Sequence, residues 1–332
     1  MYRYFIFFVL AVTTFAASCG QTGKSPESKS RMKQPAVEVP LFNADSAYTY
    51  TAEQVAFGPR VPNTPAHVGC GNYLVSQLKR FGAAVFEQNV ELTAYDGTLL
   101  KARNIIGSFQ PENNNRIMLF AHWDSRPFSD RDPDPANYHT PIDGANDGAG
   151  ACATLLEIAR QIGQQQPAVG IDILFFDAED WGVPDFDEKN QHISSWCLGS
   201  DFWARNPHKQ NYTARYGILL DMVSAPNARF MKEGYSLQSA PDIVRKVWEA
   251  AQILGYGSYF VAANGSTIED DHVHVIRHRR IPCIDIIQYD PETESGFGAY
   301  WHTQDDDMDH VSKKTLQATG QTVMYVIYHE KN

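Results

Sequence analysis

The 332-residue sequence lacks several features that would each point to a particular class of protein. None of its five cysteines lies in a Cys-x-x-Cys pair, which argues against a zinc site built from cysteines. Basic residues are scarce, with 28 Lys and Arg against 39 Asp and Glu. The resulting net charge of −11 argues against nucleic acid as a partner, because a phosphate backbone needs a basic surface.

The amino-terminal residues predict export. Arg3 precedes an apolar run at residues 5–12 that is too short to span a bilayer as a helix, and small residues lead up to Cys19. We predict a signal peptide at residues 1–18 and a lipid-anchored flexible tether at residues 19–40, with Cys19 acylated. Cleavage by the ordinary signal peptidase is the alternative. The expected location is the periplasm, with membrane contact only through the lipid anchor.

Four further cysteines remain after Cys19: Cys70, Cys152, Cys197 and Cys283. An exported protein can pair them, and four cysteines allow three complete pairings. The sequence does not choose among these pairings.

Several charged residues do not by themselves indicate a site. We interpret the basic run at residues 277–280 and the acidic run at residues 305–307 as solvated loops. Histidines outside the main motifs are expected to be exposed or packed rather than metal ligands. These are His272, His274, His278 and His310.

Short apolar runs that end abruptly in polar residues predict strands buried on both faces of a sheet. They lie at residues 117–121, 171–176, 218–220 and 281–287, and two further strands are expected at 84–92 and 99–106. Helical spacing of apolar residues is found at 65–81, 149–162, 241–254 and 315–328. This alternation predicts an α/β fold with a mostly parallel central sheet flanked by helices on both faces. No linker follows residue 40, so we expect a single catalytic domain over residues 41–332.

Acidic residues and histidines follow several of these predicted strands, at the edge where ligands bind in open α/β sheets. They are His122, Asp124, Asp147, Glu179, Asp180, Asp221 and, nearer the carboxyl end, His302. Carboxylates packed together repel unless a cation compensates their charge. A mixture of carboxylate and imidazole donors suits zinc. Adjacent side chains at a strand end point in different directions, so one of Glu179 and Asp180 can bind metal while the other acts as a base.

As an ordered set, these motifs resemble the M28 zinc aminopeptidase superfamily, which includes the animal-type glutaminyl cyclases. The resemblance rests on His122-x-Asp124, Gly144-Ala145-Asn146-Asp147, Glu179-Asp180, Leu220-Asp221 and Trp301-His302-Thr303. Two features favour the cyclase branch: Trp301 directly precedes His302, and residues 268–272 are similar to a cyclase segment that supplies an extra buried Asp.

The resemblance implies an activity and a role for each site residue. A glutaminyl-peptide cyclotransferase converts the amino-terminal Gln of peptides and proteins to pyroglutamate and releases ammonia. The implied roles are zinc ligands for Asp147, Asp180 and His302, general acid and base for Glu179, an acidic network for Asp221 and Asp270, pocket walls for Trp301 and Trp196, and support for His122 and Asp124.

The sequence also departs from the animal enzymes. Asp180 stands where they have Glu, and Ala121 stands where they have a cysteine, so the disulfide found there cannot form.

Two other readings remain open. A two-zinc aminopeptidase would use the same scaffold, with Asp147 bridging the ions and with His122 and Asp221 each completing a site. A binding domain that has lost catalysis would keep the fold, but the intact Glu179 argues against it. We expect a monomer with one zinc ion in the cyclase reading and two in the aminopeptidase reading.

Overall fold

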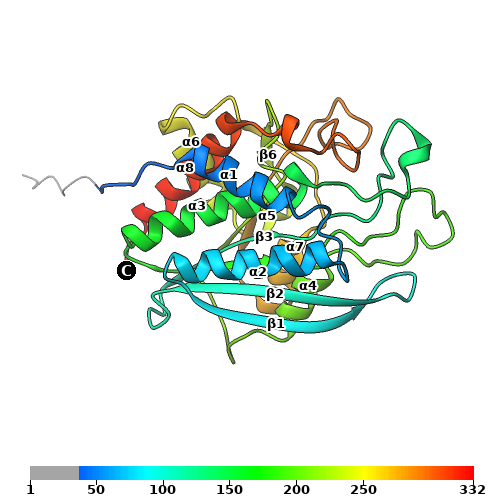
Figure 1. Cartoon of the computed structure of the whole chain (residues 1–332). Helices are drawn as coiled ribbons and strands as arrows, with labels where there is room; N and C mark the ends of the chain where they lie inside the picture. Colours follow the sequence, from blue (N-terminus) through cyan, green and yellow to red (C-terminus); the bar gives the residue numbers. More distant parts are fainter. Residues whose placement is uncertain (1–36) are drawn as a thin grey trace, which may run out of the picture. The chain divides into compact units, whose positions relative to one another are not determined.

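A six-stranded β-sheet organises the part of the chain that the computed structural model describes, residues 37–332 (Figure 1). The strand order is β1-β2-β4-β3-β5-β8, with bounds β1 Ala84–Thr93, β2 Leu99–Phe109, β3 Arg116–His122, β4 Gly170–Phe176, β5 Gly217–Asp221 and β8 Cys283–Ile287. The four strands β4, β3, β5 and β8 are mutually parallel. Strand β2 pairs antiparallel with β4, and β1 pairs antiparallel with β2. The predicted mostly parallel α/β fold is therefore confirmed.

Helices cover both faces of this sheet, and each face has its own apolar core. The helices are α1 Ala44–Val55, α2 Pro65–Arg80, α3 Ala151–Gln164, α4 Leu198–Arg205, α5 Gly234–Ser239, α6 Pro241–Ile253, α7 Asp271–Arg279 and α8 Lys313–His329. Residues of α1, α2, α3, α6 and α8 pack on one face, and α4 and α7 pack on the other. Within β3, Leu119 belongs to the first core and Phe120 to the second, which explains why the strand is apolar at consecutive positions.

Local signals set the beginnings of the longest helices. The Thr64 side chain caps α2 by accepting a hydrogen bond from the His67 backbone N–H, and Pro65 occupies the first turn, where its missing N–H costs nothing. Ser312 caps α8 in the same way through the Thr315 N–H. The elements that were not foreseen include α1, α5, α7 and the small parallel pair of β6 Phe230–Lys232 and β7 Phe260–Asn264. The interpretation of the basic run at residues 277–280 as a solvated loop was wrong, because residues 277–279 form the last turn of α7, where basic side chains complement the helix dipole.

The four cysteines of the described chain are all buried and free, so none of the three possible pairings is formed. No helix in residues 37–332 is long and apolar enough to cross a bilayer. The predicted signal peptide, Cys19 and most of the predicted tether lie outside the described residues.

Candidate active site

The site lies at the carboxyl ends of β4, β3 and β5, where the chain order reverses. The chain runs from β3 to β4 on one side, and β5 then joins β3 on the other side. A crevice opens at such a switch point, and it is the expected ligand site in an open α/β sheet. His122 is the last residue of β3 and Asp221 the last residue of β5, while Glu179 and Asp180 follow β4 closely.

Asp147, Asp180 and His302 lie together, as the family resemblance implied. One donor atom from each of these buried residues lies within 4.8 Å of the other two. His302 Nε2 is 3.4 Å from Asp180 Oδ1 and 3.8 Å from Asp147 Oδ2. Neither carboxylate oxygen of Asp180 has a hydrogen-bond partner within the described protein, although both are buried. Buried carboxylates are costly without compensation, so this donor set fits a divalent cation.

A second donor set shares Asp147 with the first. His122 Nε2 is 2.9 Å from Asp147 Oδ1 and 3.3 Å from Asp221 Oδ1. These three residues are also buried and mutually within 4.8 Å. The arrangement that the aminopeptidase reading requires is therefore present alongside the one that the cyclase reading requires.

Strained backbone places these donors. Ala178, Cys197, Met222 and His302 are non-glycine residues with left-handed φ values of 53°, 57°, 47° and 56°, and each is a site residue or lies next to one. Such conformations are costly and persist where the surrounding structure enforces them. Gly148 follows Asp147 with a φ of 100°, and a Cβ there would lie 2.9 Å from the Asp124 carbonyl oxygen. Only glycine satisfies both constraints without strain.

Asp124 holds the Glu179-Asp180 segment in place. Its carboxylate accepts hydrogen bonds from the backbone N–H groups of Glu179 at 3.1 Å and of Asp180 at 3.2 Å. Asp124 Oδ1 is also 3.7 Å from His122 Nδ1. Asp124 thus holds the backbone of two site residues and is not among the residues that line the pocket described below.

Sequence reasoning missed the ion pair between Arg126 and Asp130. Both are buried, and the guanidinium binds both carboxylate oxygens at 2.7 Å. Asp130 Oδ1 is 3.4 Å from His302 Nδ1, so it can orient the imidazole whose other nitrogen faces Asp147 and Asp180. The Arg-x-x-x-Asp spacing inside a long polar loop is the only signal that the sequence offered.

The interpretation of residues 305–307 as a solvated acidic run was wrong for Asp306, whose side chain is buried. Its carboxylate accepts hydrogen bonds from the backbone N–H groups of Asn146 at 2.7 Å and of Asp147 at 3.0 Å. Asp306 therefore fixes the backbone that carries Asp147, the residue common to the two donor sets. Burial and the neighbouring Asp147 charge raise the pKa of Asp306 to about 7, against the effect of these two bonds.

Glu179 faces the pocket among other acidic groups. Loss of hydration raises the pKa of its carboxyl well above the ordinary range; His122 opposes this, and the charges of Asp180 and Asp270 add to it. The Cys197 thiol donates a hydrogen bond to Glu179 Oε1 at 3.2 Å. A carboxyl group in this environment binds a proton more readily than one in water, which suits a group that must take and return a proton.

Further carboxylates lie behind Glu179. Asp270 begins α7 as its N-cap, and burial together with the charge of Asp221 raises its pKa to about 7. Asp271 and Asp285 are fully buried, and burial and the Asp270 charge raise both of their pKa values well above the ordinary range. Asp221 and Asp270 line the same pocket as Glu179. The buried Asp271 and Asp285 extend this group of carboxylates.

The donors open into a pocket of about 280 Å³ with aromatic and aliphatic walls. Trp301 stacks on His302 with ring centroids 3.7 Å apart, and Trp196 stacks on the same ring at 5.9 Å. A Cβ at Gly182 would lie 1.8 Å from the Trp196 indole, so only glycine allows this ring position. The lining residues that sequence reasoning did not name are Met222, Ile268, Glu269, Ile287 and Phe297. Such a pocket is at the small end for ligand sites and is of a size for one side chain.

With the geometry established, comparison with known proteins is informative. The sequence profile of peptidase family M28 matches residues 104–327. Aminopeptidase YwaD of Bacillus subtilis is 28% identical over 288 residues, which cover 81% of this chain and 54% of YwaD. This chain therefore spans about half the length of that curated relative.

Two solved structures are much more similar. A Zn-dependent exopeptidase from Parabacteroides distasonis is 63% identical, with a TM-score of 0.87, and the match covers 88% of this chain and all of that one. The glutaminyl cyclase of Bacteroides thetaiotaomicron bound to N-acetylhistamine is 60% identical, also with a TM-score of 0.87, and the match covers 89% of this chain and all of that one.

Proposed function

The chain belongs to peptidase family M28, and from its site we propose that it is a glutaminyl-peptide cyclotransferase, which converts amino-terminal Gln to pyroglutamate and releases ammonia. The observation that carries the proposal is the pair of buried carboxyl groups of Asp221 and Asp270 beside Glu179. The 60% identity with a bacterial glutaminyl cyclase over its whole length supports it.

The Asp221–Asp270 pair bears on the number of metal ions. Burial and the charge of Asp221 raise the pKa of Asp270 to about 7, so this carboxyl group binds a proton more readily than one in water. A protonated Asp270 would lessen the repulsion that Asp221 experiences, without a second cation. We therefore propose one zinc ion at the catalytic centre of each chain, held by Asp147, Asp180 and His302.

When bound there, zinc would supply Lewis-acid polarisation of the substrate's γ-carbonyl group. The remaining chemistry belongs to side chains of the protein. Glu179 takes a proton from the substrate's α-amine, whose nitrogen forms a bond to the γ-carbon and closes a five-membered ring. Glu179 then gives that proton to the departing nitrogen as the old C–N bond breaks, so that ammonia leaves and the carboxyl group is regenerated. The reaction is an acyl transfer to the substrate's own amine.

The pocket favours this intramolecular route over hydrolysis. Because the nucleophile is part of the substrate, the protein has only to hold the Gln side chain folded back on its own amine. Trp301, Trp196 and Phe297 provide apolar surface around that side chain and leave little room for water. Arg126 and Asp130 hold the His302 ring that lies beneath Trp301.

The two-zinc aminopeptidase is a second candidate, because His122, Asp147 and Asp221 form a complete second donor set. In that reading Asp221 binds an ion and Glu179 activates a water molecule. Comparison of the zinc contents of the wild type and His122→Ala separates the two, because His122 is a ligand only in the aminopeptidase reading: equal contents support the cyclase, and a loss of about one zinc per chain supports the aminopeptidase.

The direct test uses a dipeptide amide that begins with Gln. We expect equal amounts of ammonia and pyroglutamyl product, and none of either from the Glu-initiated analogue at neutral pH. Release of free Gln instead would establish the aminopeptidase, and inertness towards both Gln peptides and aminoacyl amides would establish a binding domain.

We further propose that the protein acts outside the cytoplasm, as a monomeric periplasmic lipoprotein anchored through Cys19, on peptides and proteins that begin with Gln. The supporting features are Arg3, the apolar run at residues 5–12 and the small residues before Cys19. Cys19→Ala should move the protein from the membrane fraction to the soluble periplasmic fraction, and unchanged membrane association would refute the anchor.

A further inference from the structure

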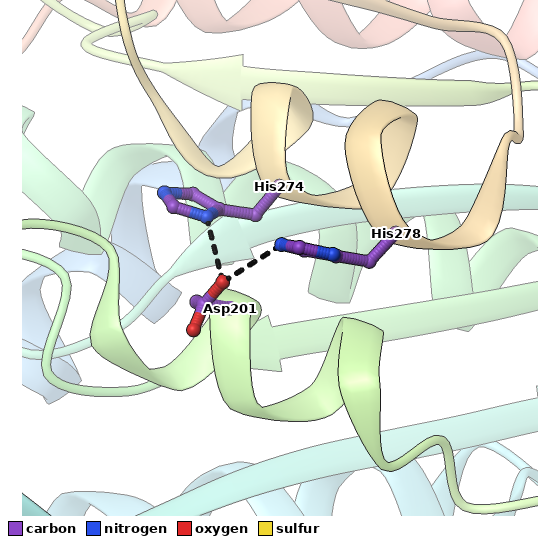
Figure 2. Close-up of side chains that lie close together, drawn as sticks. All are labelled: Asp201, His274 and His278. Carbon is purple, nitrogen blue, oxygen red and sulfur yellow. Dashed lines mark hydrogen bonds and ion pairs between the residues drawn. The ribbon is translucent and has the colours of Figure 1, made fainter.

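A further group of side chains that can bind a metal ion lies between α4 and α7, on the opposite side of the sheet from α3 (Figure 2). Asp201 is in the first turn of α4, and His274 and His278 are one helical turn apart on α7. Asp201 Oδ1 is 3.1 Å from His274 Nδ1 and 3.1 Å from His278 Nε2. Both imidazoles point towards the same carboxylate oxygen.

We propose that Asp201, His274 and His278 bind a divalent transition-metal ion of the zinc type, at a site separate from the catalytic pocket. One donor atom from each residue lies within 4.8 Å of the other two. Ligands at ordinary zinc distances in a tetrahedral site lie roughly 3.3 Å from one another. The two observed oxygen–nitrogen separations are already close to that value, so the three side chains need to move little to share an ion.

The donor types and their exposure fit such an ion. Two neutral imidazoles and one carboxylate match the preference of zinc, and three protein ligands leave a fourth position for water. The side chains of His274, His278 and Asp201 are 13%, 20% and 30% exposed, respectively, so water and ions reach them.

Arg205 is the competing partner of Asp201. Its Nε donates to Asp201 Oδ1 at 3.1 Å and to Oδ2 at 2.9 Å. This pair is formed within one helix at the protein surface, and the Arg205 side chain is 56% exposed. Exposed pairs of this kind contribute little to stability, so an ion can displace Arg205 from Oδ1 while Oδ2 keeps its bond. The ion pair thus competes with metal binding but does not prevent it.

The site would connect two helices that both begin at the catalytic pocket. Trp196 and Cys197 immediately precede α4, and Asp270 is the N-cap of α7. These three residues contact the pocket or Glu179. An ion held by Asp201 and the two histidines would therefore restrain the spacing of α4 and α7, which pack against each other.

The test is the zinc content of the untagged protein after equilibrium dialysis against zinc, measured by elemental analysis. We expect His278→Ala and Asp201→Asn each to bind about one zinc per chain fewer than the wild type. His310→Ala is the matched control, because His310 also lies 3.1 Å from an aspartate, Asp307, but joins no donor triad among the described residues. Its zinc content should equal that of the wild type.

Two further variants make the test independent of folding and of the catalytic ion. Arg205→Gln should keep the site and raise its zinc affinity, because it removes the competing cation. His302→Ala should lose the catalytic zinc. The double variant His302→Ala/His278→Ala should bind about one zinc per chain fewer than His302→Ala. Equal zinc contents in the wild type, His278→Ala and Asp201→Asn, with each variant folded by circular dichroism, would overturn the proposal.

Discussion

Replacement of Glu179 by Gln isolates the proton-transfer role from every other role of the site. Gln has nearly the same shape, and its amide oxygen can still accept the hydrogen bond that Cys197 donates to Oε1. The three proposed zinc ligands are separate residues, so metal binding should be retained. The variant removes only the ability to bind and release a proton.

The expected loss follows from the usual contribution of general acid–base catalysis. A factor of about 10² to 10⁴ corresponds to about 2.7–5.4 kcal/mol of transition-state free energy. The loss should appear in kcat, with KM nearly unchanged, because the pocket walls are untouched. The melting temperature should be unchanged or higher, since burial and the neighbouring carboxylates disfavour the ionised form of Glu179.

The assay follows ammonia release from a Gln-initiated dipeptide amide, with zinc content and thermal unfolding measured on the same preparation. Turnover within tenfold of the wild type by a folded, zinc-loaded Glu179→Gln protein would remove Glu179 from the mechanism. Loss of zinc in this variant would instead mean that Glu179 takes part in the ligand set.

Three further predictions concern the metal, the pocket and the fold. His302→Ala should lose zinc and activity while remaining folded, and full metal occupancy by elemental analysis would show that the ligand set is wrong. Trp301→Ala should raise KM for Gln peptides by about tenfold or more because it removes apolar contact with the side chain, and an unchanged KM would place Trp301 outside the binding surface. Asp172→Asn should lower the free energy of urea unfolding by about 3–5 kcal/mol, because it leaves the buried Arg116 guanidinium without its carboxylate partner. Burial raises the pKa of Asp172, but the hydrogen bonds and charge of Arg116 outweigh burial and lower the pKa overall. The stabilisation by the Arg116–Asp172 ion pair is therefore present above about pH 4 and is lost as the pH falls further. Equal stability of the wild type and Asp172→Asn at pH 7 would refute this reasoning.

The sequence predicted the central strands well because they are buried on both faces. The apolar run at 117–121 became β3 and the run at 171–176 became β4, each shifted by at most one residue at either end. The pair β6 and β7 was missed because these strands are short and only the first residue of β7, Phe260, is buried. The helix expected from residue 149 begins at Ala151, because the preceding segment is kinked where Asp147 and Gly148 leave helical geometry.

The site was predictable to the extent that its residues follow strands. His122, Asp180 and Asp221 could be grouped because parallel strands end at one edge of a sheet. Asp306 and Asp130 could not be grouped in this way, because they reach the site from long loops whose course depends on tertiary contacts. For the same reason, no sequence pattern associates His274 and His278 with Asp201, which lies 73 residues before His274 and on another helix.

The sequence by itself determined the α/β class, the edge of the sheet that carries the chemistry and the residue types available there, because hydrophobic periodicity and strand ends are local properties of a chain. Only the tertiary structure decided which donors share an ion and which acid is buried rather than solvated. Those outcomes depend on distances of a few ångströms between segments far apart in sequence, and on the exclusion of water that their packing produces.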